Sequence, residues 1–254
     1  MKIPVELIQQ IADAQSVAVL TGAGVSAESG VPTFRDAQTG LWSIFNPEEL
    51  ATPRAFRRNP RLVWEWYEYR RKLVAEAKPN PAHEALAQME ELFPEFHLIT
   101  QNIDGLHQRA GSRKVIELHG NITRTKCFDE DTIISSWEES AEVPPKCPNC
   151  GGFLRPDVVW FEELLPQLEL EMALHAATTC DVFLSIGTSA VVYPAAALPL
   201  EAHNCGATVV VINPQPTPLS EHAYCVLTGA AGVVMPELVK ALRDAGRAAS
   251  SIPN

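Results

Sequence analysis

The sequence of 254 residues has no apolar run of about 18 residues, so we expect no membrane-spanning helix. Its first residues lack the apolar stretch and small-residue cleavage site of a secretory leader, and we therefore expect a cytoplasmic protein. Basic residues number only 20 against 31 acidic ones, and the net charge of −11 disfavours binding to nucleic acid or to an anionic membrane. Six cysteines suit reduced thiols or metal ligands better than a disulfide frame.

Short apolar runs alternate with helical patterns along the chain. The runs lie at 16–20, 97–100, 115–118, 158–161, 182–186 and 208–212, and the helical patterns lie at 5–14, 82–92, 167–178 and 193–204. Continuously apolar strands that alternate with helices indicate a parallel sheet covered on both faces. The pattern predicts an α/β fold with a Rossmann-like, doubly wound parallel sheet.

Two stretches interrupt this alternation. Residues 36–80 are rich in Trp, Arg and Pro and read as a helical insert, whereas residues 121–155 are polar and contain the pair Cys147-Pro148-Asn149-Cys150. We expect the second insert to resemble a zinc ribbon and both inserts to form a smaller lobe. The Rossmann-like domain would then consist of residues 1–35, 81–120 and 156–254.

A glycine-rich turn follows the first predicted strand. Gly22, Gly24 and Ala27 form a G-x-G-x-x-A pattern, which lets backbone amides approach a pyrophosphate at a helix N-terminus. A dehydrogenase would show an acidic residue about 20 positions later, but residues 29–36 form a loop with Gly and Pro. Hydride transfer therefore fits poorly, and the pattern by itself is compatible with a dinucleotide site or with a plain tight turn.

Polar residues follow other predicted strands. Asn102 and Asp104 come just after the run at 97–100, and His119 comes just after the run at 115–118. Parallel strands end at one edge of a sheet, so these side chains should share the rim that carries the glycine turn. A histidine with a pKa near 6.5 can accept a proton at neutral pH, while each residue alone could equally be a strand-end cap.

These motifs, taken in order, resemble those of the sirtuins, the NAD-dependent protein lysine deacylases. The matching strings are Gly22–Ser26, Gly30–Arg35, Gln101–Asp104, His119–Gly120, Gly187–Ser189 and Ile212–Pro214. The resemblance implies that NAD is consumed: the acyl oxygen of a modified lysine displaces nicotinamide and forms an alkylimidate. The products would be free lysine, nicotinamide and O-acyl-ADP-ribose.

The same resemblance implies roles for individual residues. His119 would be the general base for a ribose hydroxyl, Asn102 would order the ribose and a water, and Asp104 would contact the nicotinamide amide. The implied NAD-binding residues are Gly22, Ala23, Gly24, Ser26, Thr33, Phe34, Arg35, Trp42, Gln101, Asn102, Ile103, Asp104, Gly187, Thr188, Ser189, Asn213, Pro214, Gln215 and Ala231.

Tyr67 and Arg70 indicate which acyl group is removed. They resemble the Tyr-x-x-Arg segment of class III sirtuins, which prefer succinyl-, malonyl- and glutaryl-lysine. Residues three apart share a helix face, so the hydroxyl and guanidinium could bind one carboxylate. Alternatively, both side chains only brace the helix. By resemblance, Val158 and Phe161 would pair with the substrate peptide, although Glu162 stands where relatives usually have Gly.

The cysteines depart from the family pattern. Sirtuins usually hold a structural zinc ion with two Cys-x-x-Cys pairs. Cys147 and Cys150 supply one pair here, but Cys127 stands alone in the other, with Glu130 at the place of the fourth thiolate. Three outcomes stay open: zinc bound with Glu130 or a neighbouring aspartate as an oxygen ligand, a weakened site, or no metal.

Other functions fit parts of the sequence. Mono-ADP-ribosyl transfer or NAD hydrolysis could use the same scaffold, and a non-catalytic NAD-sensing module would need neither Asn102 nor His119. The central domain of thiamine-diphosphate enzymes shares the fold class but gives no role to Tyr67, Arg70 or the cysteines. We expect acylated protein lysines as substrates and a monomer or weak oligomer.

Overall fold

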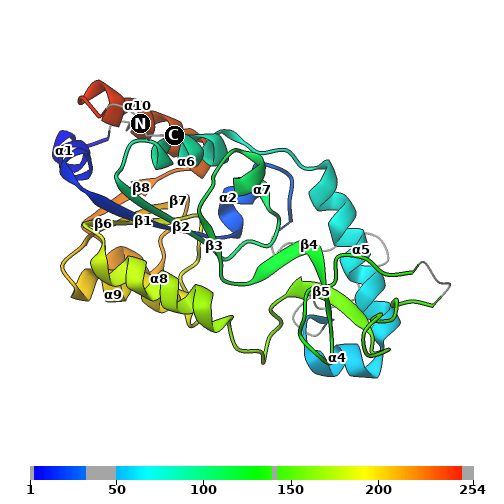
Figure 1. The fold of residues 1–254 in the computed structure, drawn as a ribbon. Helices are drawn as coiled ribbons and strands as arrows, with labels where there is room; N and C mark the ends of the chain where they lie inside the picture. Colours follow the sequence, from blue (N-terminus) through cyan, green and yellow to red (C-terminus); the bar gives the residue numbers. More distant parts are fainter. Residues whose placement is uncertain (1–2, 33–49, 139–141, 248–254) are drawn as a thin grey trace.

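A computed structural model of the chain describes residues 3–32, 50–138 and 142–247. Figure 1 shows a larger part, in which helices flank a sheet, and a smaller lobe beside it. Within the described residues, no helix is both long and apolar enough to cross a membrane. In the smaller lobe, residues 53–76 lie beside residues 120–127 and 154–158, although part of the sheet separates them in the sequence.

Six parallel strands form the main sheet in the order β3-β2-β1-β6-β7-β8. Their bounds are β1 Ser16–Thr21, β2 Glu95–Thr100, β3 Val115–Glu117, β6 Val182–Ile186, β7 Thr208–Asn213 and β8 Cys225–Thr228. The chain order reverses between β1 and β6, which pair from Val17 with Val182 to Thr21 with Ile186. Open α/β sheets bind ligands at the carboxyl end of such a switch point. The predicted doubly wound sheet is confirmed.

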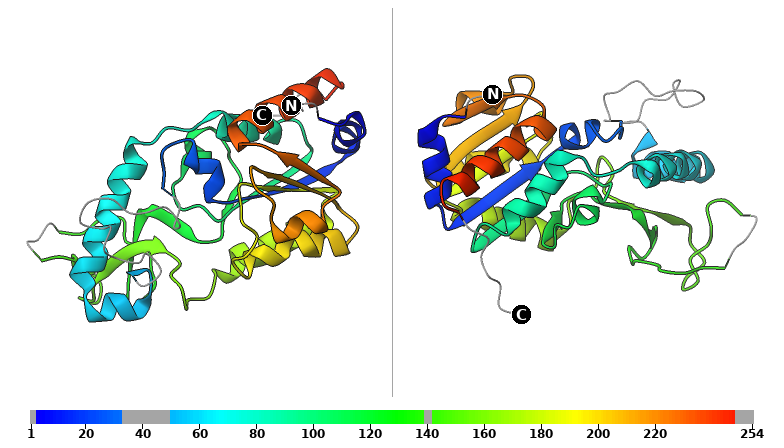
Figure 2. Two further views of the ribbon diagram at one scale, coloured as in Figure 1. Left: turned by 180° about the vertical axis from the view of Figure 1, so that it is seen from behind. Right: turned by 90° about the horizontal axis from the view of Figure 1, so that it is seen from above.

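Helices cover both faces of this sheet (Figure 2). One face packs against α1 (Val5–Asp13), α6 (Pro81–Glu90) and α10 (Ala231–Asp244). The other face packs against α8 (Gln167–Thr179), η2 (Ala195–Ala197) and α9 (Leu198–Asn204). Every residue of β1 and β6 is buried, which explains why neither strand alternates between apolar and polar residues.

The smaller lobe joins α4 (Pro53–Arg58) and α5 (Pro60–Glu76) to an antiparallel pair, β4 (Gly120–Cys127) and β5 (Leu154–Val158). Asn59 ends α4 and starts α5, because its side chain accepts a hydrogen bond from the Leu62 amide. Phe56, Trp66 and Trp160 are buried in the core of this lobe.

Two sequence expectations about strands were wrong. The run at 158–161 adds no strand to the parallel sheet: only Val158 lies in a strand, the antiparallel β5. Trp160 makes this run apolar because its ring packs in the core of the smaller lobe. The pattern also missed β8, which is short and has only Leu227 fully buried, so it lacks an apolar run. The helical pattern at 193–204 begins instead with η2, and η3 (Pro218–Glu221) precedes β8.

Candidate active site at the carboxyl edge of the sheet

Two glycine turns meet where β1 and β6 end. The Gly24 amide donates to the Gly187 carbonyl at 2.8 Å, just inside α2 (Ala23–Ala27). A Cβ on Gly24 would lie 2.7 Å from that carbonyl oxygen, and a Cβ on Gly187, whose φ is +59°, would lie 2.5 Å from the Val25 nitrogen. The glycines therefore allow the two turns to pack together, which leaves the start of α2 at the switch point of the sheet.

Ser26, Asn102 and Asp104 form a buried cluster behind this turn. The Ser26 hydroxyl donates to Asp104 Oδ2 at 2.7 Å, and Asn102 Nδ2 donates to Ser26 Oγ at 3.1 Å. Asn102 Nδ2 also donates to the Gly22 carbonyl at 3.1 Å. Asp104 Oδ1 accepts from the Leu106 amide at the start of α7 (Leu106–Arg109). Asn102 and Asp104, which were predicted at the rim, are thus held together with Ser26 in one hydrogen-bonded unit.

His119 lies at the edge of the site with a defined tautomer. Its Nδ1 lies 2.9 Å from the Gln101 carbonyl oxygen, which can only accept a hydrogen bond, so Nδ1 carries the proton. Nε2 is then the basic nitrogen. Burial lowers the pKa of His119 from 6.5, although the bond to Gln101 raises it in part. At neutral pH the ring is a neutral base.

Other predicted NAD-binding residues surround the same strand ends. Gln101 Nε2 donates to Thr188 Oγ1 at 3.0 Å and so bridges the ends of β2 and β6. Asn213, at the end of β7, donates through Nδ2 to the Gln215 carbonyl. The remaining described members are the exposed Ala23 and Pro214, the half-buried Ser189, and Ile103 and Ala231, which are buried. Thr33, Phe34, Arg35 and Trp42 lie outside the described residues.

Tyr67 and Arg70 lie together on α5, as their spacing predicts. The Tyr67 hydroxyl accepts a hydrogen bond from Trp160 Nε1 at 2.9 Å, and both rings are buried. Burial raises the pKa of Tyr67, so the phenol is protonated at neutral pH. The Arg70 guanidinium lies 5.0 Å from the centre of the Trp66 ring, and burial lowers the pKa of Arg70. The pair is thus a neutral donor beside a half-buried arginine whose Nη1 is shielded from solvent.

The turn at 160–163 carries the predicted peptide-binding residues. Glu163 accepts from the Trp160 amide and forms an ion pair with Arg155, which folds the chain back. Glu162 has a φ of +75°, a backbone conformation that favours glycine, and its carboxylate pairs with Arg54 of α4. Phe161 is 43% exposed, whereas the Val158 side chain is buried in the core of the smaller lobe.

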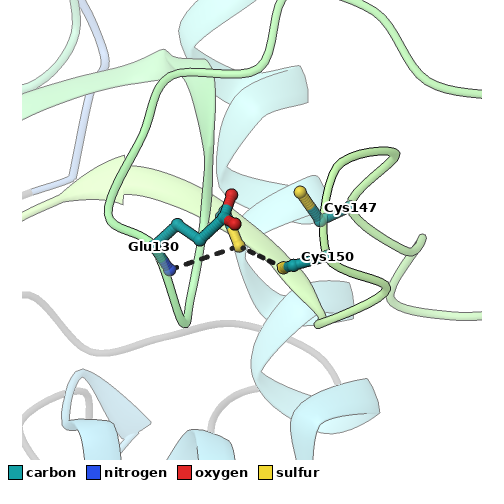
Figure 3. A group of neighbouring side chains, drawn as sticks. Glu130, Cys147 and Cys150 are labelled. Atoms are coloured by element: carbon teal, nitrogen blue, oxygen red, sulfur yellow. Dashed lines mark hydrogen bonds between the residues drawn. The ribbon is translucent and has the colours of Figure 1, made fainter.

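Cys127, Glu130, Cys147 and Cys150 converge in the smaller lobe. Figure 3 shows Glu130 facing Cys147 and Cys150. The four ligand atoms lie within 4.8 Å of one another, and the sulfurs of Cys127 and Cys150 are 3.4 Å apart. A tetrahedral zinc ion would place its ligands roughly 3.5 to 3.8 Å apart, so the cluster could bind zinc after small shifts. The Glu130 carboxylate occupies the place of the missing thiolate, which favours the first of the three expected outcomes.

Replacement of Glu130 by alanine should weaken zinc binding by at least about 10-fold, since only three thiolates would remain. Cysteine at this position should strengthen binding by completing four thiolates. Glu138→Ala, in an exposed residue of the same insert, is the control. Metal content by mass spectrometry and competition with a chromogenic chelator measure the effect. Equal zinc retention by the wild type and Glu130→Ala would show that the carboxylate is no ligand.

Sequence reasoning missed two residues of the site. His83 on α6 lies with Nε2 3.4 Å from Ser26 Oγ, and Trp160 donates to Tyr67. These partners are 57 and 93 residues apart in the sequence, so no local spacing could reveal them. The only local signal is the buried Asn80–His83 capping box at the start of α6, which fixes the His83 ring.

Comparison with known proteins places this arrangement among related chains. A model of the Sir2 family matches residues 22–194. A protein of Aquifex aeolicus (strain VF5) named NAD-dependent protein deacylase is 56% identical over 209 residues, which cover 82% of this chain and 87% of that protein.

Two solved structures extend this likeness to the fold. The crystal structure of a Sir2 homolog–NAD complex has a TM-score of 0.89 at 47% identity, covering 96% of this chain and 95% of that one. The structure of Sir2Af2 bound to a myristoylated histone peptide has a TM-score of 0.75 at 36% identity, covering 94% and 96%. The matches thus span the large part and the smaller lobe together.

Proposed function

We propose that this chain, which belongs to the Sir2 family and is an NAD-dependent protein deacylase, prefers lysines that carry acidic acyl groups, namely succinyl, malonyl and glutaryl. Acetyl-lysine would be a secondary substrate. The main support for this preference is the arrangement on α5, where the Tyr67 hydroxyl accepts from Trp160 and lies next to the Arg70 guanidinium.

The Tyr67 oxygen accepts a hydrogen bond. Trp160 donates to it at 2.9 Å, and the Arg70 guanidinium lies 5.6 Å from the centre of the Tyr67 ring. Its own proton must therefore point away from Trp160, and among the described residues the Tyr67 hydroxyl donates no hydrogen bond. A buried O–H without an acceptor is costly, so a ligand oxygen is the natural partner. A carboxylate on the acyl chain would supply it.

Arg70 favours the same ligand. Burial of a cation is unfavourable, and Tyr67 and Asp104 offset only part of that effect on the Arg70 pKa. An acyl carboxylate would add a full negative charge and could accept two parallel hydrogen bonds from the guanidinium. An acetyl group offers neither. The proposed selectivity thus follows from one half-buried cation and one oriented phenol.

The rim residues suit the steps of a deacylation that consumes NAD. The glycine turns would admit the pyrophosphate, and Asn102 and Asp104 would hold the ribose and nicotinamide side, as the resemblance implies. His119 Nε2 would take a proton from a ribose hydroxyl, which then attacks the carbon of the acyl group. The exposed Phe161 would contact the substrate peptide, in line with the acylated peptide bound to Sir2Af2. The cytoplasmic location and the monomeric or weakly oligomeric state stay predictions.

The test uses one peptide sequence with acetyl, succinyl, malonyl or glutaryl on its lysine. With NAD and purified protein, nicotinamide release should give a kcat/KM for succinyl-lysine at least about 10-fold above acetyl-lysine, as one charged hydrogen-bonded contact can provide. Mass spectrometry should find O-acyl-ADP-ribose. A preference for acetyl-lysine would contradict the proposed selectivity. ADP-ribosylated protein, or NAD cleavage without peptide, would instead favour the transferase or hydrolase alternative.

A further inference from the structure

A stacked pair of buried histidines lies behind the active-site cluster. The rings of His83 and His107 have centroids 4.9 Å apart and are tilted by 56°. Their residues are 0% and 1% exposed, so neither ring reaches solvent. His107 is the second residue of α7, the helix whose start is held by Asp104. None of the sequence motifs includes His107, and the proposed reaction gives it no task.

A first chain of hydrogen bonds leads from His107 to the backbone of Asn102. His107 Nε2 lies 2.9 Å from Thr21 Oγ1, and Thr21 Oγ1 donates to Thr100 Oγ1 at 2.8 Å. Because the Thr21 proton is directed to Thr100, the Thr21 oxygen accepts from His107, whose proton therefore sits on Nε2. Thr100 Oγ1 also accepts from the Asn102 amide at 3.0 Å. His107 thus orients the Thr21 hydroxyl, which in turn orients the Thr100 hydroxyl that accepts from the Asn102 amide.

A second chain leads from His83 to the side chain of Asn102. The Asn80 amide donates to His83 Nδ1, so the His83 proton sits on Nε2 and points to Ser26 Oγ. Ser26 Oγ also accepts from Asn102 Nδ2 and donates to Asp104. The backbone and the side-chain amide of Asn102 are therefore held by two chains of hydrogen bonds, one from His107 and one from His83.

Both rings are neutral at the pH where these chains of hydrogen bonds operate. Burial, together with the neighbouring His83, lowers the pKa of His107 to about 3. Burial also lowers the pKa of His83, and the Asp104 carboxylate raises it in part. A neutral ring is required at His83, because its Nδ1 accepts from the Asn80 amide while its Nε2 donates to Ser26 Oγ. Nδ1 of His107 has no hydrogen-bond partner among the residues described.

We propose that His107 is a positioning residue for the deacylation, acting through Thr21 and Thr100 to hold Asn102 in the orientation that binds the NAD ribose. This inference rests on the role proposed for Asn102. It predicts an effect on turnover that is separable from packing, since a phenylalanine can fill the space of the His107 ring but cannot donate to Thr21. It also predicts that glutamine, which carries a donor on its side chain, restores part of the function.

The experiment compares His107→Phe, His107→Gln and Thr100→Val in the full chain, with Asn102→Ala in the same series. Loss of one buried hydrogen bond of about 1.4 kcal/mol corresponds to a 10-fold change, so His107→Phe should lower kcat about 10-fold with an unchanged KM for the acyl peptide. His107→Gln should recover a part of that loss. The double variant His107→Phe/Thr100→Val should fall no further than the worse single variant.

Other results would overturn either the positioning role of His107 or the role proposed for Asn102. Unchanged kcat in His107→Phe, additive losses in the double variant, or equal losses in the Phe and Gln variants together with a lowered Tm would overturn the positioning role. Full turnover by Asn102→Ala would instead overturn the role proposed for Asn102 itself. His97→Phe is the matched control, because His97 is half-buried in β2 near Glu95 and His175 and should leave kcat unchanged.

Discussion

His119→Asn should lower kcat for deacylation by about 1,000-fold, within the range that general-base catalysis contributes. An asparagine side chain can keep the hydrogen bond to the Gln101 carbonyl through its Nδ2, but it has no counterpart of the basic Nε2. Displacement of nicotinamide by the acyl oxygen needs no base, so exchange of labelled nicotinamide into NAD should persist with acyl peptide present. Quantified O-acyl-ADP-ribose and exchange measure the two steps. Retained product formation would remove His119 from the mechanism.

The pH dependence of kcat in the wild type should report the protonation of His119 Nε2. The protonated ring cannot accept a proton, so kcat should fall as the pH drops through the pKa of His119. Because burial lowers that pKa, the acid limb should lie below pH 6.5. In His119→Asn this limb should vanish from the residual rate. A wild-type profile whose acid limb lies above pH 6.5 would point to another base.

The sheet was predictable where strands are buried on both faces. Strands such as β1 and β6 contain only buried residues, so their sequences are mostly apolar and do not alternate with polar residues. However, the hydrophobicity of a segment does not reveal whether it packs in the core of the main sheet or in the core of the smaller lobe. Residues 158–161 satisfy the same pattern because Trp160 packs against Phe56 and Tyr67, in the core of the smaller lobe.

The residues at the ends of the strands were predictable from the sequence, whereas their tertiary hydrogen bonds were not. All parallel strands end at one edge, which brings Asn102 and His119 to the glycine turn without any knowledge of tertiary contacts. Other contacts of the site join distant parts of the chain: Trp160 donates to Tyr67 across 93 residues, and His107 contacts Thr21 across 86 residues. Such contacts depend on how the layers pack, and no local spacing encodes them.

The acyl-group preference should depend on Arg70. Arg70→Met should lower kcat/KM for succinyl-lysine by about 100-fold, as expected when a charge-assisted, paired hydrogen bond to a carboxylate is lost. Methionine keeps an unbranched apolar stem against Trp66, so the helix should stay packed and kcat/KM for acetyl-lysine should change by less than about twofold. The measurement is nicotinamide release with matched succinyl and acetyl peptides.

The comparison of two peptides separates recognition of a carboxylate from bracing of the helix. Lys72→Met is the matched control, since Lys72 is an exposed cation on the same helix and its loss changes the net charge equally. It should leave both substrates unaffected. If Arg70 only braced α5, the Met variant would lose activity on both peptides in parallel, with a lowered Tm. A selective loss on the succinyl peptide at unchanged Tm requires that the guanidinium contacts the acyl group, because the acetyl peptide uses every other contact of the same site.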